Sequence, residues 1–329
     1  MEFSSLSEKT RLDRLQPPDG KVRIVIDTDT FNEIDDQFAV VHALLSPEKL
    51  LVESIYAAPF FNHKSSSPGN GMELSYEEIL RLLDRLDLPS DNLVYRGSDG
   101  FLKDYDYPYS NSAVDDLIDR AMSSDEILYV VAIAALTNIA SAILKEPEII
   151  KKIVVVWLGG NALHWPHAVE FNLAGDVLAS RVVLNCGVPL VLLPCAGVTT
   201  HLRTTVPEIE RYVQGKSAIG NYLAETFKGY KDDHFAWSKE IWDIVATAYL
   251  INPDWIKTNI VASPIISQGT AGDVFNHNSD SWIKHPLSWS FDDGRHKIRC
   301  AYYVERDPIF RDLFTKLEQW ANGSITLAK

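Results

Sequence analysis

Short apolar runs alternate with amphipathic segments along the first two-thirds of the chain. Apolar residues occupy almost every position of five runs, which lie at residues 22–27, 50–58, 127–136, 152–160 and 188–195. Such runs are typical of strands that are buried on both faces of a parallel sheet. The segments between them place residues of one face at helical spacing, as Phe38, Val41, His42 and Leu45 show. This alternation predicts an α/β fold, with a mostly parallel central sheet flanked by helices in a single, Rossmann-like domain.

The pattern is less regular after about residue 200. We predict a helix that has Ser238 as its N-cap and runs through residues 240–251. A late strand is predicted at 297–305, followed by a helix at 307–321. Residues 263–296 are rich in Ser, Gly, Asn and Asp, and predict loops or an edge hairpin.

Composition limits the partners that we expect for this chain. Its formal net charge is −14, and an acidic surface disfavours binding to nucleic acid or to anionic membranes. The first residues lack the apolar segment of a signal peptide, and no apolar run is long enough to span a bilayer. We therefore predict a polar tail at 1–20, one domain at 21–329 and a cytoplasmic location. Cys186, Cys195 and Cys300 show no pairable spacing, so we expect them to be reduced and buried.

Four aspartates crowd the end of the first predicted strand: Asp27, Asp29, Asp35 and Asp36. Carboxylates at this spacing repel one another and are costly to bury unless a positive charge is present, and a divalent cation supplies one. No Cys or His stands among them, so the donor atoms are oxygens, which favours Ca²⁺ or Mg²⁺. The alternative is structural, because Asp35 and Asp36 would favour a helix start and Asp27 would cap a turn. Both interpretations are open at this point.

Two classes of enzyme place Asp-x-Asp at the end of a first strand. One is the haloacid-dehalogenase-type phosphatase, whose Asp-x-Asp signature with a following threonine has a local likeness in Asp27, Asp29 and Thr30. The late lysine and acidic motif of that class are missing from the expected strand ends, which makes the phosphatase a remote alternative. The other class is the nucleoside hydrolase.

Four later motifs follow in the order of the second class: ALTNIA at 135–140, LGG at 158–160, EFN at 170–172 and WDIVA at 242–246. With the aspartate cluster, they make residues 20–250 resemble the inosine-uridine preferring nucleoside hydrolase family, and the resemblance weakens beyond. It implies a hydrolase of N-glycosidic bonds whose partner is a small nucleoside or riboside. It also implies a homodimer or homotetramer.

The resemblance implies one bound calcium ion and a role for each carboxylate. The ion would be held by the side chains of Asp29, Asp36 and Asp243 and by the carbonyl of Ile133. Asp29 would also act as general base toward a water on the ion, which attacks ribose C1′. Asp27 would support the cluster from behind.

Other motif positions are implied to contact the substrate. Asp35, Glu170 and Asn172 would hydrogen-bond the ribose hydroxyls, and Asn161 would add a fourth contact. Trp242 would lie against the substrate, because an indole can stack on a base or a sugar.

Two departures from the family bear on the substrate. The loop between Asp29 and Asp35 is two residues longer and contains Asn32 and Glu33. These either reshape the sugar pocket or add an ion ligand, or they only lengthen the entry to the helix. Trp242 stands where many members carry a histidine that assists the leaving base, and an indole cannot replace it as a proton donor.

Assistance to the leaving group would then come from elsewhere. Four histidines are candidates: His164, His167, His201 and His234. Four tryptophans suggest an aromatic lining, although most of them could equally belong to the core: Trp157, Trp165, Trp237 and Trp242. The departures leave two alternatives open, namely hydrolysis of another riboside or carbohydrate-derived substrate, and a sugar-binding protein without catalysis.

Overall fold

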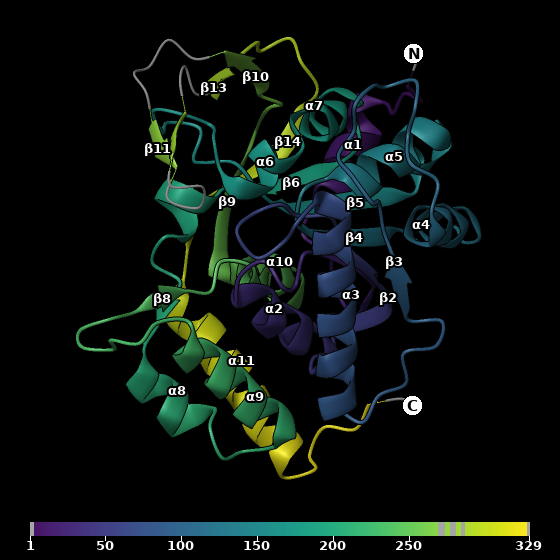
Figure 1. Cartoon of the computed structure of the whole chain (residues 1–329). Coiled ribbons are helices and arrows are strands. Elements are labelled where there is room, and N and C mark those ends of the chain that lie inside the picture. The colour runs from purple at the N-terminus through teal and green to yellow at the C-terminus, as the bar shows by residue number, and fades with distance from the viewer. Residues whose placement is uncertain (1–2, 269–273, 277–280, 284–286, 328–329) are drawn as a thin grey trace.

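The computed structural model describes residues 3–268, 274–276, 281–283 and 287–327. An eight-stranded sheet forms its centre (Figure 1), in the order β3-β2-β1-β4-β5-β6-β14-β9. Its strands are parallel except β9, which pairs antiparallel with β14 at one edge. This sheet confirms the predicted α/β class. The strands are β1 (Val22–Thr28), β2 (Leu50–Ala57), β3 (Val94–Arg96), β4 (Leu128–Ile133), β5 (Ile153–Leu158), β6 (Leu190–Leu193), β9 (Ile256–Ala262) and β14 (Lys297–Val304).

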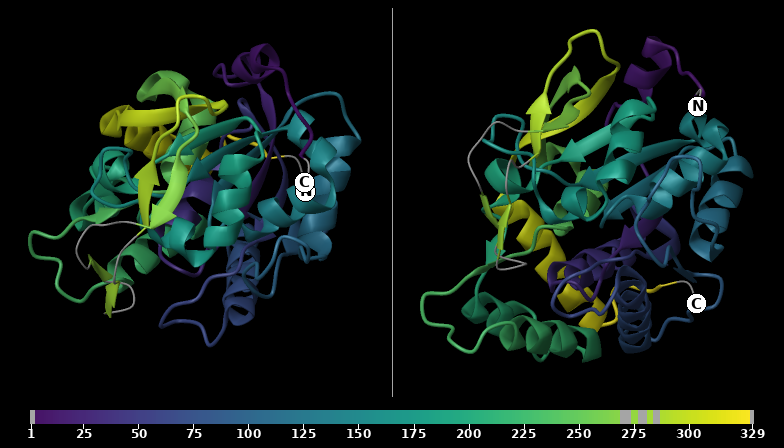
Figure 2. Two further views of the ribbon diagram at one scale, coloured as in Figure 1. Left: turned by 90° about the horizontal axis from the view of Figure 1, so that it is seen from above. Right: turned by 45° about the horizontal axis from the view of Figure 1, so that its top comes forward.

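Helices cover both faces of the sheet (Figure 2), and strand side chains alternate between two buried clusters. In β1, Ile24 and Ile26 pack into one cluster and Val25 into the other, which explains why the run is apolar at every position. The first cluster includes residues of α2 (Asp35–Leu44), α3 (Pro68–Arg85), α8 (Val206–Tyr212), α9 (Ala218–Gly229), α10 (Ile244–Ile251) and α11 (Arg306–Ala321). The second includes residues of α4 (Ser112–Met122), α5 (Thr137–Lys145), α6 (Phe171–Gly175) and α7 (Val177–Asn185). Short helical turns lie at Pro147–Lys151, Cys195–Thr199 and Pro253–Trp255.

The predicted start of the helix at Ser238 is wrong. Residues Lys239–Glu240 form the short strand β8, which pairs antiparallel with β7 (Arg203–Thr204). An ion pair between Arg203 and Glu240 reinforces this ladder. The helix α10 begins only at Ile244, and Asp243 is its N-cap residue. The late strand and the last helix are confirmed as β14 and α11.

The stretch 263–296 contains the predicted hairpin. Its strands β10 (Ile265–Gln268) and β13 (Leu287–Ser290) pair antiparallel, as do β11 (Val274–Asn276) and β12 (Ser281–Ile283). Residues 269–273, 277–280 and 284–286 of this stretch lie outside the described residues. The predicted tail contains helix α1 (Glu8–Arg14), and Arg11 donates a hydrogen bond to the carbonyl of Gly187.

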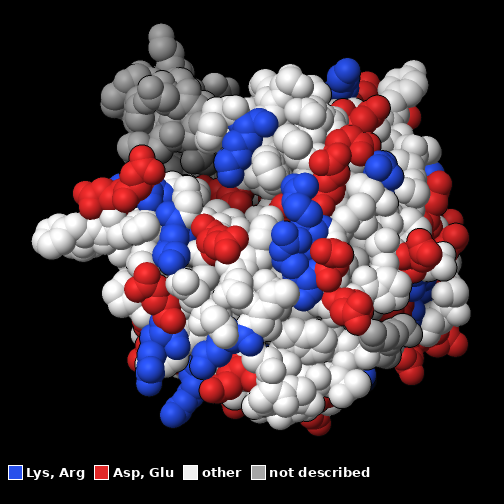
Figure 3. Space-filling view, turned by 60° about the horizontal axis from the view of Figure 1, so that its bottom comes forward, with Lys and Arg blue, Asp and Glu red and all other residues white. Residues whose placement is uncertain are grey.

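Charges are distributed without a continuous basic area on the face that Figure 3 shows, where acidic and basic side chains are interspersed. Among the described residues, no helix is long and apolar enough to cross a membrane. Cys186, Cys195 and Cys300 are free and buried, as predicted.

The order of the sheet places a crevice at the end of β1. The chain runs from β1 to β2 on one side, whereas β4 occupies the other side of β1. In open α/β sheets, ligands bind beyond the carboxyl ends of the strands at such a reversal. The register pairs Thr28 at the end of β1 with Ile133 at the end of β4, so the two segments that carry Asp29 and Ile133 leave the sheet side by side.

Candidate active site

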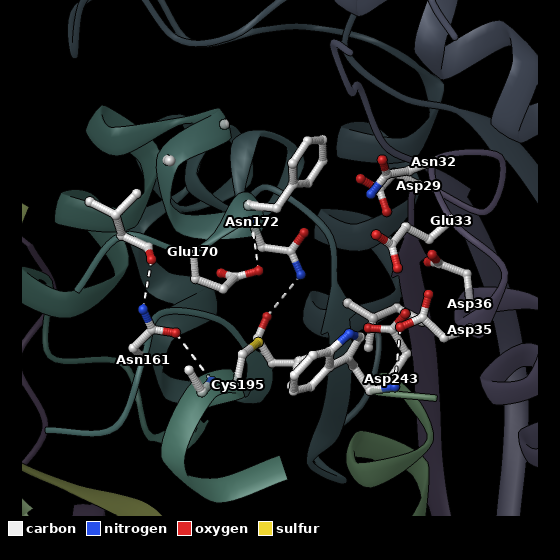
Figure 4. A pocket seen from close by; sticks show the side chains of 18 of the residues that line it. Asp29, Asn32, Glu33, Asp35, Asp36, Asn161, Glu170, Asn172, Cys195 and Asp243 are labelled. Atoms are coloured by element: carbon white, nitrogen blue, oxygen red, sulfur yellow. Dashed lines mark hydrogen bonds between the residues drawn. The ribbon is translucent and has the colours of Figure 1, made fainter. Parts of the chain in front are cut away.

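A cavity of about 560 Å³ opens at this end of the sheet, which is a volume typical of small-molecule sites. All residues predicted to hold the ion or the substrate line it, and most are shown in Figure 4: Asp29, Asp35, Asp36, Ile133, Asn161, Glu170, Asn172, Trp242 and Asp243. They come from β4 and from loops and helix starts that are far apart in sequence. The structure therefore brings the predicted residues together.

Three buried carboxylates form the densest part of the site. Oxygens of Asp35, Asp36 and Asp243 lie within 4.8 Å of one another, and each residue is at most 4% exposed. Asp29 is 1% exposed and lines the same cavity beside them. Burial, and then the charges of the neighbouring aspartates, raise the pKa of Asp29, Asp36 and Asp243 well above the usual range. Such a group of oxygens is costly without a counter-charge, so its chemistry fits a hard divalent cation.

The hydrogen bonds of these carboxylates leave oxygens free. Asp36 accepts from Thr28 Oγ1 at 2.5 Å, and Asp29 Oδ2 is buried with no hydrogen-bond partner among the described residues. Asp243 is the N-cap residue of α10 but makes no side-chain capping hydrogen bond. A purely structural role, in which the aspartates only cap a helix or a turn, therefore explains the position of Asp36 in the first turn of α2. It does not explain the unpartnered oxygen of Asp29.

Asp27 lies two residues before Asp29 and is not among the described residues that line the cavity, and its supporting role stays a prediction. Asn138 Nδ2 donates to Asp27 Oδ1 at 2.8 Å, while Asp27 Oδ2 has no partner in the described part of the chain. Burial raises the pKa of Asp27 to about 7, although the hydrogen bond from Asn138 opposes the rise. Asn138 in turn accepts hydrogen bonds from the backbone and hydroxyl of Ser98. Asn138 of the LTN motif thus joins the end of β1 to the loop after β3.

The EFN motif has a structural role that the sequence did not show. Glu170 is the N-cap residue of α6 and accepts from the backbone nitrogens of Asn172, Leu173 and Gly160 at 2.9, 3.1 and 2.8 Å. Burial raises the pKa of Glu170 to about 6. Asn172 Nδ2 donates to the carbonyl of Leu158 at 3.0 Å, and its Oδ1 has no hydrogen-bond partner among the described residues.

Asn161 is the most fully engaged of the predicted sugar contacts. Its Nδ2 donates to the carbonyl of Val169 at 2.7 Å, and its Oδ1 accepts from Ala196 N at 3.1 Å. Its own carbonyl accepts from Trp289 Nε1 at 2.9 Å, which ties the β10–β13 hairpin to the cavity wall. Asn161 therefore holds three segments together at the edge of the site.

Residues 30–34 form the loop between Asp29 and Asp35, which we call the inserted loop. It contributes both Asn32 and Glu33 to the cavity wall. Asn32 Oδ1 accepts from Asn62 Nδ2 at 2.7 Å. Glu33 is paired with Lys239, whose Nζ lies 2.6 Å from Glu33 Oε2. Lys239 was not predicted from the sequence. The one feature that could have indicated it is the position of a lysine three residues before Trp242, in a motif whose other charged residues are acidic.

The aromatic lining is confirmed for one of the four tryptophans, and the alternative of a core position is confirmed for another. Trp242 lines the cavity, whereas Trp157 is buried in the core, Trp165 is 40% exposed and Trp237 packs on Tyr230. The remaining aromatic wall comes from phenylalanines that we did not predict: Phe61, Phe101 and Phe171. The sequence feature that could have indicated them is their position, since Phe61 and Phe101 follow the ends of strands and Phe171 is the middle residue of the EFN motif.

One of the four candidate histidines, His167, lines the cavity. Burial lowers the pKa of His167. His201 is bonded to the carbonyl of Val304, and His234 to that of Lys228, outside the cavity. Cys195, which was predicted only to be a reduced and buried thiol, also lines the cavity. Burial raises the pKa of its thiol.

A family model described as inosine-uridine preferring nucleoside hydrolase matches residues 68–309. The chain belongs to this family. The match begins after the aspartate cluster and extends beyond residue 250.

Curated relatives of this family match part of the chain. The pyrimidine-specific ribonucleoside hydrolase RihB of Escherichia coli (strain K12 / DH10B) is 33% identical over 156 residues, which are 45% of this chain and 50% of that protein. A putative RihB of Shigella boydii serotype 4 is 33% identical over the same length, which is 64% of that protein. The chain thus spans between 50% and 64% of the length of these relatives.

Solved structures of family members share the fold over nearly the whole chain. A purine-preferring ribonucleoside hydrolase from Gardnerella vaginalis superposes with a TM-score of 0.69 at 22% identity, covering 91% of this chain and 99% of that one. The plant nucleoside hydrolase PpNRh1 gives 0.67 at 21% identity, covering 90% and 99%. These similarities confirm a single α/β domain of this fold.

Proposed function

We propose that this protein is a calcium-dependent nucleoside hydrolase that cleaves the bond between C1′ of a ribose and the nitrogen of its base. The observation that carries the proposal is the cavity in which oxygens of Asp35, Asp36 and Asp243 lie within 4.8 Å of one another, next to Asp29. Family membership and the RihB relatives support this reaction class. Whether the base is a purine or a pyrimidine is left open, because relatives of both preferences occur.

The residues that would hold the ion are Asp29, Asp36 and Asp243, with the carbonyl of Ile133. Asp35 joins this set as a further candidate, because its oxygens belong to the close group. A bound calcium ion would supply positive charge that offsets the carboxylates and orients substrate hydroxyls.

Asp29 is proposed as the general base. Its Oδ2 is buried, has no donor among the described residues and is therefore free to accept a proton from the attacking water. As the water oxygen bonds to C1′, the bond from C1′ to nitrogen breaks and its electron pair leaves with the base. Glu170 and Asn172 would hold ribose hydroxyls through the acceptor capacity that their backbone contacts leave unused. Trp242 and the phenylalanines would pack against the base and exclude water.

The test is an assay of ribose release from uridine, inosine and p-nitrophenyl riboside. We expect release that stops on calcium chelation and returns when calcium is added. Metal analysis of the untreated protein should find calcium. A folded protein that binds calcium and ribose but releases no sugar from any riboside would favour the sugar-binding alternative. Release of phosphate from a phosphoester would favour the phosphatase.

Two further expectations accompany the proposal. The resemblance supports a homodimer or homotetramer, which light scattering would measure. The composition supports a cytoplasmic location, which stays a prediction.

A further inference from the structure

The inserted loop and the segment that leads to α10 are joined by an ion pair. Lys239 Nζ lies 2.6 Å from Glu33 Oε2, and the two side chains are 8% and 23% exposed. Lys239 also donates to the carbonyl of Glu240 at 3.2 Å, and its Nζ lies 6.0 Å from the ring centre of Trp242. Few waters can reach this pair, so its attraction is stronger than that of a surface ion pair.

A second contact joins the same two segments three residues further on. The backbone nitrogen of Trp242 donates to Asp35 Oδ2 at 3.1 Å. Residues 239–242 are therefore attached to residues 33–35 at two points, although the segments are 206 residues apart in the chain. Asp243 follows directly, and these contacts place its carboxylate beside Asp35 and Asp36.

The close approach of Asp243 needs such an attachment. Its neighbours Asp35 and Asp36 are acidic, and its side chain makes no capping bond to α10, so its side-chain hydrogen bond goes to the acidic neighbour Asp35. Whenever these carboxyl groups are ionised and no ion is present, repulsion between them opposes the approach. Lys239 brings a positive charge to the same place and offsets part of that repulsion, since its charge also acts on Asp35.

We propose that Lys239 and Glu33 are positioning residues, whose ion pair holds the segment with Asp243 against Asp35 and Asp36, so that the cation site is closed before an ion binds. The inference rests on the proposed function for the identity of the ion. It assigns the inserted loop a task, namely to carry the partner of Lys239. The loop then acts on the site through Asp243 and supplies no ligand of its own.

Calcium affinity is the first readout. In titrations with calcium chloride, we expect Lys239→Met and Glu33→Gln each to weaken binding about ten-fold, as is typical for residues that orient metal ligands. The double variant should bind no more weakly than the weaker single variant, because both changes break one contact. Lys239→Arg keeps the charge and should bind within about three-fold of the unchanged protein.

The matched control is Glu240→Gln. Glu240 pairs with Arg203 and ties the same short strand to β7, and no ion pair or hydrogen bond among the described residues joins its side chain to the inserted loop. We expect this variant to bind calcium as the unchanged protein does. Equal loss of affinity in Glu240→Gln and Lys239→Met would overturn the inference, since loosening of β8 in general would then explain both. Full affinity in Lys239→Met and Glu33→Gln would overturn it as well.

Hydrogen exchange in the calcium-free protein is the second readout. Amides of residues 239–246 should exchange faster in Lys239→Met than in Glu240→Gln, because the first variant releases the segment from the inserted loop. This comparison needs no ion. If the unchanged protein binds no calcium, the proposed function fails, and unchanged exchange in Lys239→Met would separately refute the positioning role.

Discussion

Asn138 donates a hydrogen bond from Nδ2 to Oδ1 of Asp27 at 2.8 Å, and both side chains are fully buried. Asn138 Oδ1 also accepts from the backbone nitrogen of Ser98 at 2.8 Å. One amide thus joins the last acidic residue of β1 to the loop after β3. Because Asp27 stands two residues before Asp29, which lines the cavity, we expect this contact to affect both the stability of the sheet and the shape of the site.

The change Asn138→Leu should lower the free energy of unfolding by about 2–3 kcal/mol, because it leaves a carboxylate and a backbone N–H buried without their partner. Denaturation in urea would measure it. The exposed Asn259 offers a control, and Asn259→Leu should change the free energy by less than about 0.5 kcal/mol. Equal stability of Asn138→Leu and the unchanged protein would show that Asp27 does not depend on this bond.

Asp29→Asn should separate activity from stability. Turnover should fall by about 10²–10⁴-fold, since the amide cannot accept the proton of the attacking water. The calcium-free protein should become more stable by about 1 kcal/mol, because a buried carboxyl with a raised pKa costs stability at neutral pH whether it is ionised or takes up a proton, and an amide has neither cost. Initial rates and urea denaturation measure the two effects. The exposed Asp232 provides the control Asp232→Asn, which should alter neither.

Activity that survives in Asp29→Asn would remove Asp29 from the role of base. Lower stability of that variant would show instead that its carboxylate makes a favourable contact in the calcium-free protein.

Calcium affinity should fall as the pH is lowered from 8 to 5.5. The pKa values of Asp29, Asp36 and Asp243 are raised by burial and by like charges, so these groups keep protons at a pH where free aspartates have lost theirs. A cation binds the deprotonated form, so protons compete with it, and affinity falls by up to about ten-fold per pH unit for each proton released. Titration calorimetry in buffers of different ionisation enthalpy would count these protons. An affinity that is independent of pH and buffer would contradict the raised pKa values.

The fold could be predicted from sequence because strands that are buried on both faces leave continuous apolar runs, as at Ile24, Val25 and Ile26. The start of α10 could not be predicted from the sequence. Lys239 and Glu240 are extended because they pair with Arg203 and Thr204, and a partner some 35 residues away leaves no local signal.

The site shows the same division between local and distant contacts. Motif order brought the residues of the cavity together correctly, because each motif ends a strand or begins a helix at the same edge of the sheet. The finer arrangement depends on distant contacts. The predicted contact of Asp35 with the sugar stays a prediction, but its bond to the backbone of Trp242 and its place beside Asp36 and Asp243 had no signal in the sequence. The pairing of Glu33 with Lys239 is likewise a property of the folded chain.

The indole of Trp242 should affect substrate binding without affecting the ion. Its ring lines the cavity, whereas its contact with Asp35 uses the backbone nitrogen, which Trp242→Leu retains. We expect the KM for a nucleoside to rise about five- to thirty-fold, which corresponds to a loss of about 1–2 kcal/mol of packing on the base. Calcium affinity should change less than about two-fold. Steady-state kinetics and calcium titration measure the two quantities.

Trp165 supplies the control, because its ring is 40% exposed and lies outside the lining of the cavity. Trp165→Leu should leave both KM and calcium affinity unchanged. A parallel loss of calcium affinity in Trp242→Leu would mean that the ring acts by holding Asp243 in place. An unchanged KM would mean that the base does not pack on the indole, and the phenylalanine wall formed by Phe61, Phe101 and Phe171 would then be the surface that receives it.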